Sequence, residues 1–485
     1  MPNHESGILE WQEAMESGKT TSRELTVSYL QRISQYDKQG IRINAVSELN
    51  PDALHIAEAL DRERAESGSR GPLHGIPVLL KDNIATLDSM HTTAGSLAMA
   101  DSYAAHDAFL VRRLREAGAV ILGKTNLTEW ANFISDHMPN GYSSRGGQVL
   151  NPYGPGVFDV GGSSSGSGAA IAAGFAVVAV GTETSGSILH PSARNSLVGI
   201  KPTVGLISRS GIIPIATSQD TAGPMARTVE DAAILLGVLA GFDPQDPATG
   251  KSVGRVPHDY RPCLDRNGLQ GARIGIIRSR FLEAFDAEEQ QLYQTAIEQM
   301  RQAGASIVDP VSLPSEHANW NSLVLVYEFK SGLNAYLKTL PASFPLRTLR
   351  DVIRWNEEHA EEALRYGQAL FERAERTSGT LTEPEYIAQR LYDLEMSREK
   401  GIDAVLREHQ LDCLLFPHSQ GAGIAARAGY PSVCVPAGYT SAGKPFGVMF
   451  TGTAFSEPTL IRLAFAFEQA SRLRVPPALS ATHQG

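Results

Sequence analysis

The stretch GGSSSGSG, from Gly161 to Gly168, decides how this chain is interpreted. Glycine and serine alone are typical of a flexible linker between domains. The next residues, AAIAAGFAVVAVG from Ala169 to Gly181, carry no charge and form one of the most apolar segments of the chain. Because a linker does not lead directly into a core, the octet is interpreted as a tightly packed turn that presents a serine hydroxyl to a site.

Two other interpretations of the octet are less consistent with its surroundings. A glycine-rich turn before a helix can bind phosphate, but the Lys-Ser/Thr ending of a P-loop is missing. Gly162–Gly166 also matches G-x-S-x-G, the nucleophile elbow of α/β-hydrolases, with Ser164 as the nucleophile. That motif needs a strong strand before the serine, whereas the apolar strand FAVVAV follows it. A second cluster, GTETSGSI, stands at the end of this strand, where open α/β sheets place active sites, so Ser187 is the better-placed nucleophile.

Short apolar or β-branched runs punctuated by glycine and proline recur from Pro72 almost to the end of the chain. Examples are GIPVLLKDN, AGAVILGKTN, ARIGIIRS, LDCLLFP and PSVCVPAG. They alternate with helical stretches such as DAFLVRRLREAG, which predicts a mainly parallel, twisted sheet with helices on both faces. Since the runs span nearly all of the 485 residues, we expect one large α/β domain.

The chain divides into several predicted parts around this sheet. Residues 1–65 are expected to form an N-terminal helical segment packed on the core, and residues 66–485 the α/β domain, with its core motifs in 72–239. The Pro-rich, polar residues 242–271 predict a long surface connection. Residues 286–406 are largely helical and charged, and we expect this insert to wall the substrate pocket.

Composition argues against several classes of protein. Lys and Arg number 43 against 53 Asp and Glu, a net charge of −10, which disfavours a nucleic-acid surface. The 3 scattered cysteines suggest neither a disulfide framework nor a zinc site, and no two-His metal motif occurs. The start of the chain lacks an apolar signal sequence, and no uncharged run reaches the roughly 20 residues of a membrane span. We expect a cytoplasmic protein without metal, cofactor, membrane contact or nucleic-acid partner.

Several segments in a fixed order resemble the amidase signature family. They are LHGIPVLLKDN, GAVILGKTNLTEW, RGGQVLNPY, GGSSSGSGAAIAAG, GTETSGSI, NSLVGIKPTVGLISRSGIIP, QDTAGPMARTVEDAA and AGYPSVCVPAGY. The resemblance is dense from about Pro72 to Leu239, returns from Ala428 to Phe467, and looks closest to bacterial peptide amidases. It implies a single amidase-signature domain with a mixed, mostly parallel sheet.

The resemblance implies a Ser-cisSer-Lys triad formed by Ser187, Ser163 and Lys81, with a cis peptide bond before Ser163. Lys81 follows the apolar residues PVLL, and burial lowers a lysine pKa, so its amine can act as a base without a histidine. Ser163 would pass the proton between Lys81 and Ser187, whose hydroxyl attacks the amide carbonyl.

An oxyanion hole is expected from the backbone N–H groups of Thr184, Ser185, Gly186 and Ser187. The commonest family pattern, Asp-x-Gly-Gly-Ser, is replaced here by Glu183-Thr184-Ser185-Gly186-Ser187. The hydroxyl and Cβ of Ser185 are therefore expected to influence the choice of substrate.

Substrate contacts are expected from a few further residues. Trp130, Ala131 and Phe133 match positions that border the substrate in the family, and Ser164 is added because it neighbours Ser163. His190 follows Ser187 by three positions and is assigned a structural or pocket-lining role.

The resemblance implies hydrolysis of a carboxylic amide through an acyl-Ser187 intermediate. Candidate substrates are a peptide C-terminal amide, an aryl amide or an aliphatic amide, with esters or carbamates as side substrates. Two alternatives are kept: a protein like the ammonia-supplying subunit of glutaminyl/asparaginyl-tRNA amidotransferases, and a catalytically silent member that acts as a binding protein. We expect a monomer or homodimer that takes a small amide or a short peptide amide.

Overall fold

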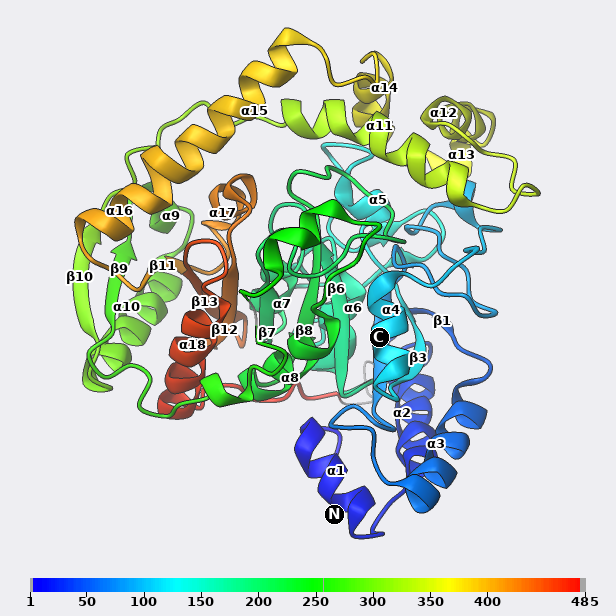
Figure 1. Ribbon diagram of the computed structural model, residues 1–485, viewed down its shortest axis with the longest axis horizontal. Coiled ribbons are helices and arrows are strands. Elements are labelled where there is room, and N and C mark those ends of the chain that lie inside the picture. The colour runs from blue at the N-terminus through cyan, green and yellow to red at the C-terminus, as the bar shows by residue number, and fades with distance from the viewer. Residues whose placement is uncertain (1–2, 256, 480–485) are drawn as a thin grey trace.

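The computed structural model describes residues 3–255 and 257–479. Its centre is an 11-stranded sheet with the order β1-β3-β2-β6-β8-β7-β12-β13-β11-β9-β10 (Figure 1). A separate two-stranded hairpin consists of β4 (Tyr142–Ser143) and β5 (Gly147–Gln148). The strands of the large sheet are β1 (Val46–Leu49), β2 (Pro77–Lys81), β3 (Val120–Thr125), β6 (Val178–Glu183), β7 (Val198–Lys201), β8 (Thr221–Ala226), β9 (Arg273–Ile277), β10 (Ser306–Val311), β11 (Cys413–Pro417), β12 (Ser432–Tyr439) and β13 (Pro445–Thr451).

Pairing within the sheet is mixed, and the two directions are separated along it. Parallel pairs join β2 to β3 and β6, and join β9 to β10 and β11. The other adjacent pairs of the described sheet are antiparallel, from β6 through β8, β7, β12 and β13 to β11, and between β1 and β3. The expected mixed sheet is confirmed, but the expectation of a mostly parallel one is wrong. The reason is that the chain often reverses directly, as in the β12–β13 hairpin, which needs no crossover helix.

Helices cover both faces of the sheet. On one face α8, α18 and α10 contact one another in a row and pack on the central strands, while α6 and α7 contact each other and pack on the other face. The helices of this core are α4 (Phe109–Glu116), α5 (Glu129–Asn132), α6 (Ser165–Ala172), α7 (Leu189–Arg194), α8 (Val229–Leu239), α9 (Ser279–Glu283), α10 (Ala287–Gln302), α16 (Asp403–Glu408), α17 (Ala422–Ala428) and α18 (Glu457–Ser471).

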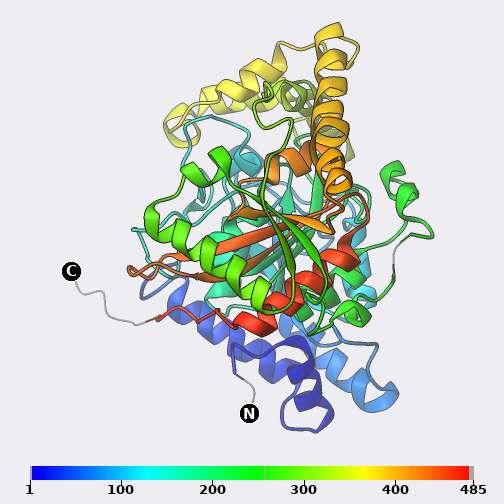
Figure 2. The ribbon, with the colours of Figure 1, turned by 90° about the vertical axis from the view of Figure 1, so that its left-hand side faces the viewer.

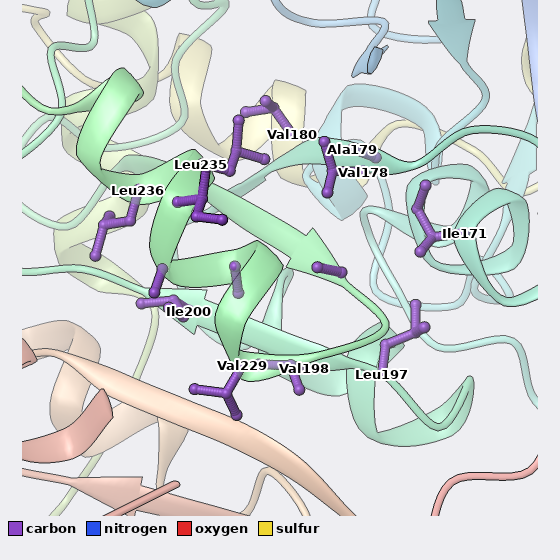
Figure 3. Packing of buried hydrophobic residues seen from close by; sticks show 14 of the residues in the cluster. Ile171, Val178, Ala179, Val180, Leu197, Val198, Ile200, Val229, Leu235 and Leu236 are labelled. Atoms are coloured by element: carbon purple, nitrogen blue, oxygen red, sulfur yellow. The ribbon is translucent and has the colours of Figure 1, made fainter. Parts of the chain in front are cut away.

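Strand β6 shows where the apolar segment after the octet goes. Every residue of β6 is buried. Val178 and Val180 belong to the same apolar cluster as Ile171 of α6 and Leu235 of α8 (Figure 3). A central strand covered on both faces is apolar on both faces, which explains the continuous apolar run in the sequence.

The N-terminal segment is helical, as expected, but it also contributes a strand. Its helices are α1 (Ile8–Glu16), α2 (Ser22–Tyr36) and α3 (Ala53–Ser67), and α2 begins at a capping box made by Thr21 and Glu24. The short strand β1, which was not predicted, pairs with β3 at the edge of the sheet. The segment is therefore built into the sheet.

A group of helices between β10 and β11 lies beyond one end of the sheet (Figures 1 and 2). These helices have their own apolar cluster, which they share with α5. They occupy only part of the expected insert 286–406, because α10, β10 and α16 belong to the core. The helices of this group are α11 (Leu323–Thr339), α12 (Leu349–Glu358), α13 (Ala360–Ala363), α14 (Ala369–Glu375) and α15 (Pro384–Ser397).

The described part of the segment 242–271 contains no strand and no α-helix. Its only regular elements are two short 3-10 helices, η2 (Pro247–Ser252) and η3 (Arg261–Cys263). A further 3-10 turn, η1 (Leu97–Met99), and a π-helical turn, η4 (Arg398–Ile402), lie elsewhere. Within the described ranges, no helix has both the length and the apolarity needed to span a membrane.

Candidate active site

The side chain of Lys81, at the end of β2, is fully buried beside the serine octet. Its Nζ donates to Ser163 Oγ at 2.7 Å and to Thr182 O at 3.3 Å. Desolvation lowers the pKa of Lys81 to about 7, although the carboxylates of Glu183 and Asp220 act in the opposite direction. An amine with a pKa near neutrality can accept a proton at physiological pH.

The octet packs closely against neighbouring backbone. The Gly162–Ser163 peptide bond is cis, as the resemblance implied. Gly161 has a φ of +72°, and a Cβ on it would lie 2.6 Å from Pro191 Cα. A Cβ on Gly166 would lie 2.3 Å from Asn126 O. These glycines are needed because no side chain fits there, and the octet is not a linker.

Ser164 is fully buried, and its hydroxyl bonds to strand β6. Its Oγ donates to Thr182 O at 3.0 Å and lies 3.3 Å from Thr182 N, from which it accepts. The expected substrate contact by Ser164 is therefore wrong, and the same burial disfavours Ser164 as an elbow nucleophile. The Ser164 N–H donates to Ser187 O at 3.1 Å, which holds the octet against the turn that carries Ser187.

Ser187 lines a cavity of about 400 Å³, which we call the polar chamber. The chamber is reached by residues from four separate parts of the chain, so its walls could not be inferred from one motif. They are Asn132, Asn140, Gly162, Ser185, Gly186, Ser187, His190, Arg194, His418, Ser419, Gln420, Ala422 and Gly423.

Glu183 organises the turn between β6 and Ser187. Its buried carboxylate accepts from the N–H groups of Gly186 at 2.7 Å, Ile188 at 2.7 Å and Leu189 at 3.0 Å. Burial raises the pKa of Glu183, while these N–H groups act in the opposite direction. A carboxylate that accepts several backbone bonds holds the turn in one conformation.

This bonding changes the expected oxyanion hole. The Gly186 N–H is already donated to Glu183, so the assignment of Gly186 does not hold. In the part of the chain that the structure describes, the N–H groups of Thr184, Ser185 and Ser187 donate to no protein acceptor. They remain the candidates for stabilising a developing negative charge.

The turn after Ser218 holds Thr184 from both sides. Thr184 Oγ1 donates to Asp220 Oδ1 at 2.5 Å, and Gln219 Nε2 donates to Thr184 O at 3.2 Å. Burial raises the pKa of Asp220 to about 7. In the sequence the segment QDTAGP was notable only as part of the resemblance, and its role in holding Thr184 was missed.

A second cavity, of about 470 Å³, lies on the other side of Thr184 and is called the apolar chamber. Its walls include Ile212 to Ile215 and, from α11, Ala335 and Tyr336. The expectation that the helical insert walls a pocket is met by α11 at this chamber.

The predicted substrate contacts of α5 separate in space. Trp130 and Phe133 are buried in the cluster with α11 and α14, where their rings lie 5.3 Å from Phe371 and 4.8 Å from Phe329, and neither residue lines the two chambers. Trp130, Ala131 and Asn132 have φ values of 51°, 54° and 71°, and this left-handed turn points successive side chains in different directions.

Only Ala131 of the three predicted contacts borders a chamber, the apolar one. Asn132, which was not predicted, lines the polar chamber. The assignments of Trp130 and Phe133 are therefore corrected, since the structure uses both rings as core.

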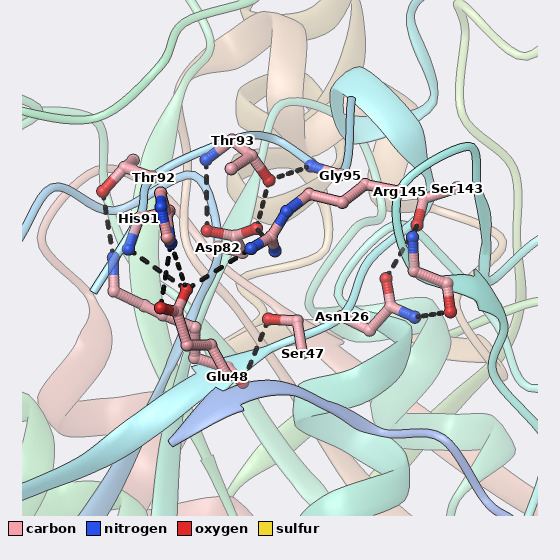
Figure 4. A network of polar contacts seen from close by, with 12 residues as sticks. Ser47, Glu48, Asp82, His91, Thr92, Thr93, Gly95, Asn126, Ser143 and Arg145 are labelled. Carbon is pink, nitrogen blue, oxygen red and sulfur yellow. Dashed lines mark hydrogen bonds and ion pairs between the residues drawn. The ribbon is translucent and has the colours of Figure 1, made fainter. Parts of the chain in front are cut away.

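A buried polar network holds the chain that follows Lys81 (Figure 4). Asp82 accepts from the Thr93 N–H at 3.1 Å and from the Thr93 hydroxyl, and lies 3.6 Å from Arg145 Nη1. Arg145 also reaches Glu48 at 3.5 Å, and Glu48 contacts His91 Nδ1 at 2.9 Å. The network thus links Asp82 to groups near the surface.

Comparison with known proteins agrees with this geometry. A family model described as Amidase matches residues 24–461. The X-ray structure of native peptide amidase from Stenotrophomonas maltophilia superposes with a TM-score of 0.93 at 48% identity, covering 98% of this chain and 99% of that one. A probable amidase of Arabidopsis thaliana is 43% identical over 486 residues, covering 98% of this chain and 91% of that protein.

The tRNA-dependent amidotransferases match less of the chain. A glutamyl-tRNA(Gln) amidotransferase subunit from Halorhodospira halophila is 40% identical over 312 residues, covering 64% of this chain and 61% of that protein. With the family model matching most of the sequence and the site in place, the chain belongs to the amidase signature family.

Proposed function

We propose that this amidase hydrolyses the C-terminal carboxamide of short peptides through an acyl-Ser187 intermediate, with Ser163 and Lys81 as proton carriers. The observation that supports this most directly is the 2.7 Å bond from Lys81 Nζ to Ser163 Oγ at a lysine whose pKa is lowered to about 7. A serine hydroxyl becomes an effective nucleophile only when a neighbouring group removes its proton.

In the proposed acylation, neutral Lys81 takes the proton of Ser163 while Ser163 takes that of Ser187. Ser187 Oγ then bonds to the carboxamide carbon, and the carbonyl π electrons move to the oxygen. The N–H groups of Thr184, Ser185 and Ser187 stabilise that charge. When the C–N bond breaks, the proton returns through Ser163 to the nitrogen, and ammonia leaves. Water releases the acid by the same steps, which restores Ser187 and neutral Lys81.

The end-to-end match to a peptide amidase supports the peptide carboxamide as substrate class over the amidotransferase alternative. The match to the amidotransferase leaves about a third of this chain unmatched. A silent binding protein is disfavoured because Lys81, Ser163 and Ser187 are all present and Lys81 is bonded to Ser163. The acyl-enzyme route also accommodates esters or carbamates as side substrates.

Covalent labelling tests the nucleophile, with the neighbouring serine cluster as its matched control. A fluorophosphonate probe should label the unchanged protein and Ser164→Ala, and should leave Ser187→Ala unlabelled, as measured by intact mass. Amide turnover, followed by ammonia release from an N-acetylated amino-acid amide, should disappear with the label. Labelling that survives in Ser187→Ala and is lost in Ser164→Ala would reverse the assignment.

A further inference from the structure

The polar chamber contains an imidazole that none of these steps uses. His418 directly follows β11 and is 1% exposed, and its N–H donates to Gly447 O at 2.8 Å. Its ring centroid lies 5.6 Å from that of His190, 5.8 Å from that of Phe285 and 6.0 Å from that of Phe446. The ring is therefore held on several sides while it forms part of the chamber wall.

One nitrogen of this ring has no partner among the described residues. His418 Nδ1 lies 3.1 Å from Ser419 Oγ, whereas the buried Nε2 has no hydrogen-bond partner there. It is also the buried unpartnered side-chain polar atom of the chamber wall. Buried polar atoms are nearly always hydrogen-bonded, so such an atom at a cavity next to a nucleophile indicates a partner that arrives with the ligand.

The backbone of His418 has a φ of 53°, in the left-handed region that is uncommon for side chains other than those of Asn, Asp and Gly. Such conformations are found where the surrounding structure enforces them, often at functional sites. Here the conformation keeps an imidazole in the chamber wall.

Burial, with smaller contributions from Arg194, His190 and Lys444, lowers the pKa of His418 well below its usual value, so the ring is neutral. A neutral imidazole offers one donor and one acceptor. If Nδ1–H donates to Ser419, Nε2 accepts; if the Ser419 hydroxyl donates to Nδ1, Nε2–H donates. A peptide group, which carries both an N–H and a C=O, satisfies either arrangement.

Other walls of the chamber have the same chemistry. Asn132, Asn140 and Gln420 carry amides, and the exposed Ser185 carries a hydroxyl. We propose that His418 is a substrate-positioning residue whose Nε2 hydrogen-bonds a peptide group on the acyl side of the substrate. The inference rests on the proposed function: a terminal carboxamide loses only ammonia, so every other peptide group belongs to the acyl part.

Two amides that differ only in that group test the proposal. N-acetylphenylalaninamide carries an acyl-side peptide group, and 3-phenylpropanamide has the same ring and carboxamide without it. His418→Asn suits the left-handed backbone and retains a polar atom near Ser419, but cannot reach the position of Nε2. It should lower kcat/KM for N-acetylphenylalaninamide about tenfold, the value of one net hydrogen bond, and leave 3-phenylpropanamide within about twofold.

A longer side chain and a distant histidine complete the design. His418→Gln places an amide nearer the Nε2 position and should recover part of the preference for N-acetylphenylalaninamide. His55→Gln, at an exposed position of α3, should change neither substrate. Equal losses on both amides in His418→Asn, or no loss on either, would overturn the positioning role. If the unchanged protein hydrolysed neither amide, the proposed function would fail and the inference with it.

Discussion

Two buried lysines on neighbouring strands show how different surroundings give one side chain different roles. Lys81 ends β2, and Lys124 lies on β3, which pairs in parallel with β2 and aligns Lys124 with Leu80. Both are fully buried, and desolvation lowers the pKa of both. Burial and residue type therefore do not distinguish them.

Their partners do. Lys124 Nζ donates to Ile84 O at 2.7 Å and to Thr92 Oγ1 at 3.0 Å, and the carboxylate of Asp82 favours its charged form. Lys81 donates instead to a serine hydroxyl, which can both give and receive a proton, in a turn that adjoins the polar chamber. A buried lysine can act as a base only if its neighbour can exchange a proton with the substrate. We therefore expect Lys124 to be structural.

The largest expected effect is the loss of activity in Lys81→Met. Methionine keeps the length of the stem but removes the base and the partner of Ser163. kcat/KM for a peptide amide should fall more than about 10⁴-fold, since the three side chains act as a unit. Lys81→Arg should be equally inactive because guanidinium stays protonated.

Thermal unfolding of the same Lys81→Met protein should show a midpoint close to that of the unchanged chain. A matched nitrophenyl ester should suffer less than the amide, because its leaving group needs no proton. If amide activity in Lys81→Met stayed within tenfold, Lys81 would not be the base.

The next largest effect is expected for stability, in Lys124→Met. This change leaves Ile84 O and the Thr92 hydroxyl without their donor and removes the positive charge near Asp82, so unfolding should become easier by about 3 kcal/mol. Urea denaturation of the two methionine variants side by side gives the comparison. Any protein that remains folded should label with the fluorophosphonate. A stable but unreactive Lys124→Met would remove the distinction between the two lysines.

The pH dependence of the unchanged protein gives a smaller effect. Lys81 must be neutral to act, and its pKa is lowered to about 7. kcat/KM should therefore be nearly constant above about pH 8 and fall tenfold per unit well below pH 7, about 100-fold at pH 5. Steady-state rates from pH 5 to about 10 would show this limb. A limb centred near the ordinary lysine value would mean that burial does not tune Lys81.

The smallest effect is expected for Asp220→Asn. The Asp220 carboxylate raises the pKa of Lys81, against the larger effect of desolvation. An asparagine keeps an oxygen that can accept from Thr184 but carries no charge, so the acidic limb should move to lower pH. Asp52→Asn, at an exposed position, should leave the midpoint unchanged. A shift to higher pH in Asp220→Asn would contradict the assigned sign.

Much of the candidate site could be predicted from local sequence. The run PVLLK predicts a buried strand that ends in a lysine, and the octet is recognisable because it leads into an apolar strand. The individual roles in the oxyanion turn could not be predicted, since the N–H of Gly186 is committed to Glu183 only in the folded turn. The α5 residues were misassigned because a left-handed turn redirects consecutive side chains.

By itself the sequence determined the amidase family, the α/β class and three candidate residues, because motifs keep their order and composition wherever the chain runs. Only the tertiary structure decided which strands run antiparallel, which of two buried lysines meets a serine hydroxyl, and that His418 enters the chamber of Ser187. These features depend on contacts between segments far apart in the chain. Local patterns record burial and turns, but not the partner that each buried polar atom finds.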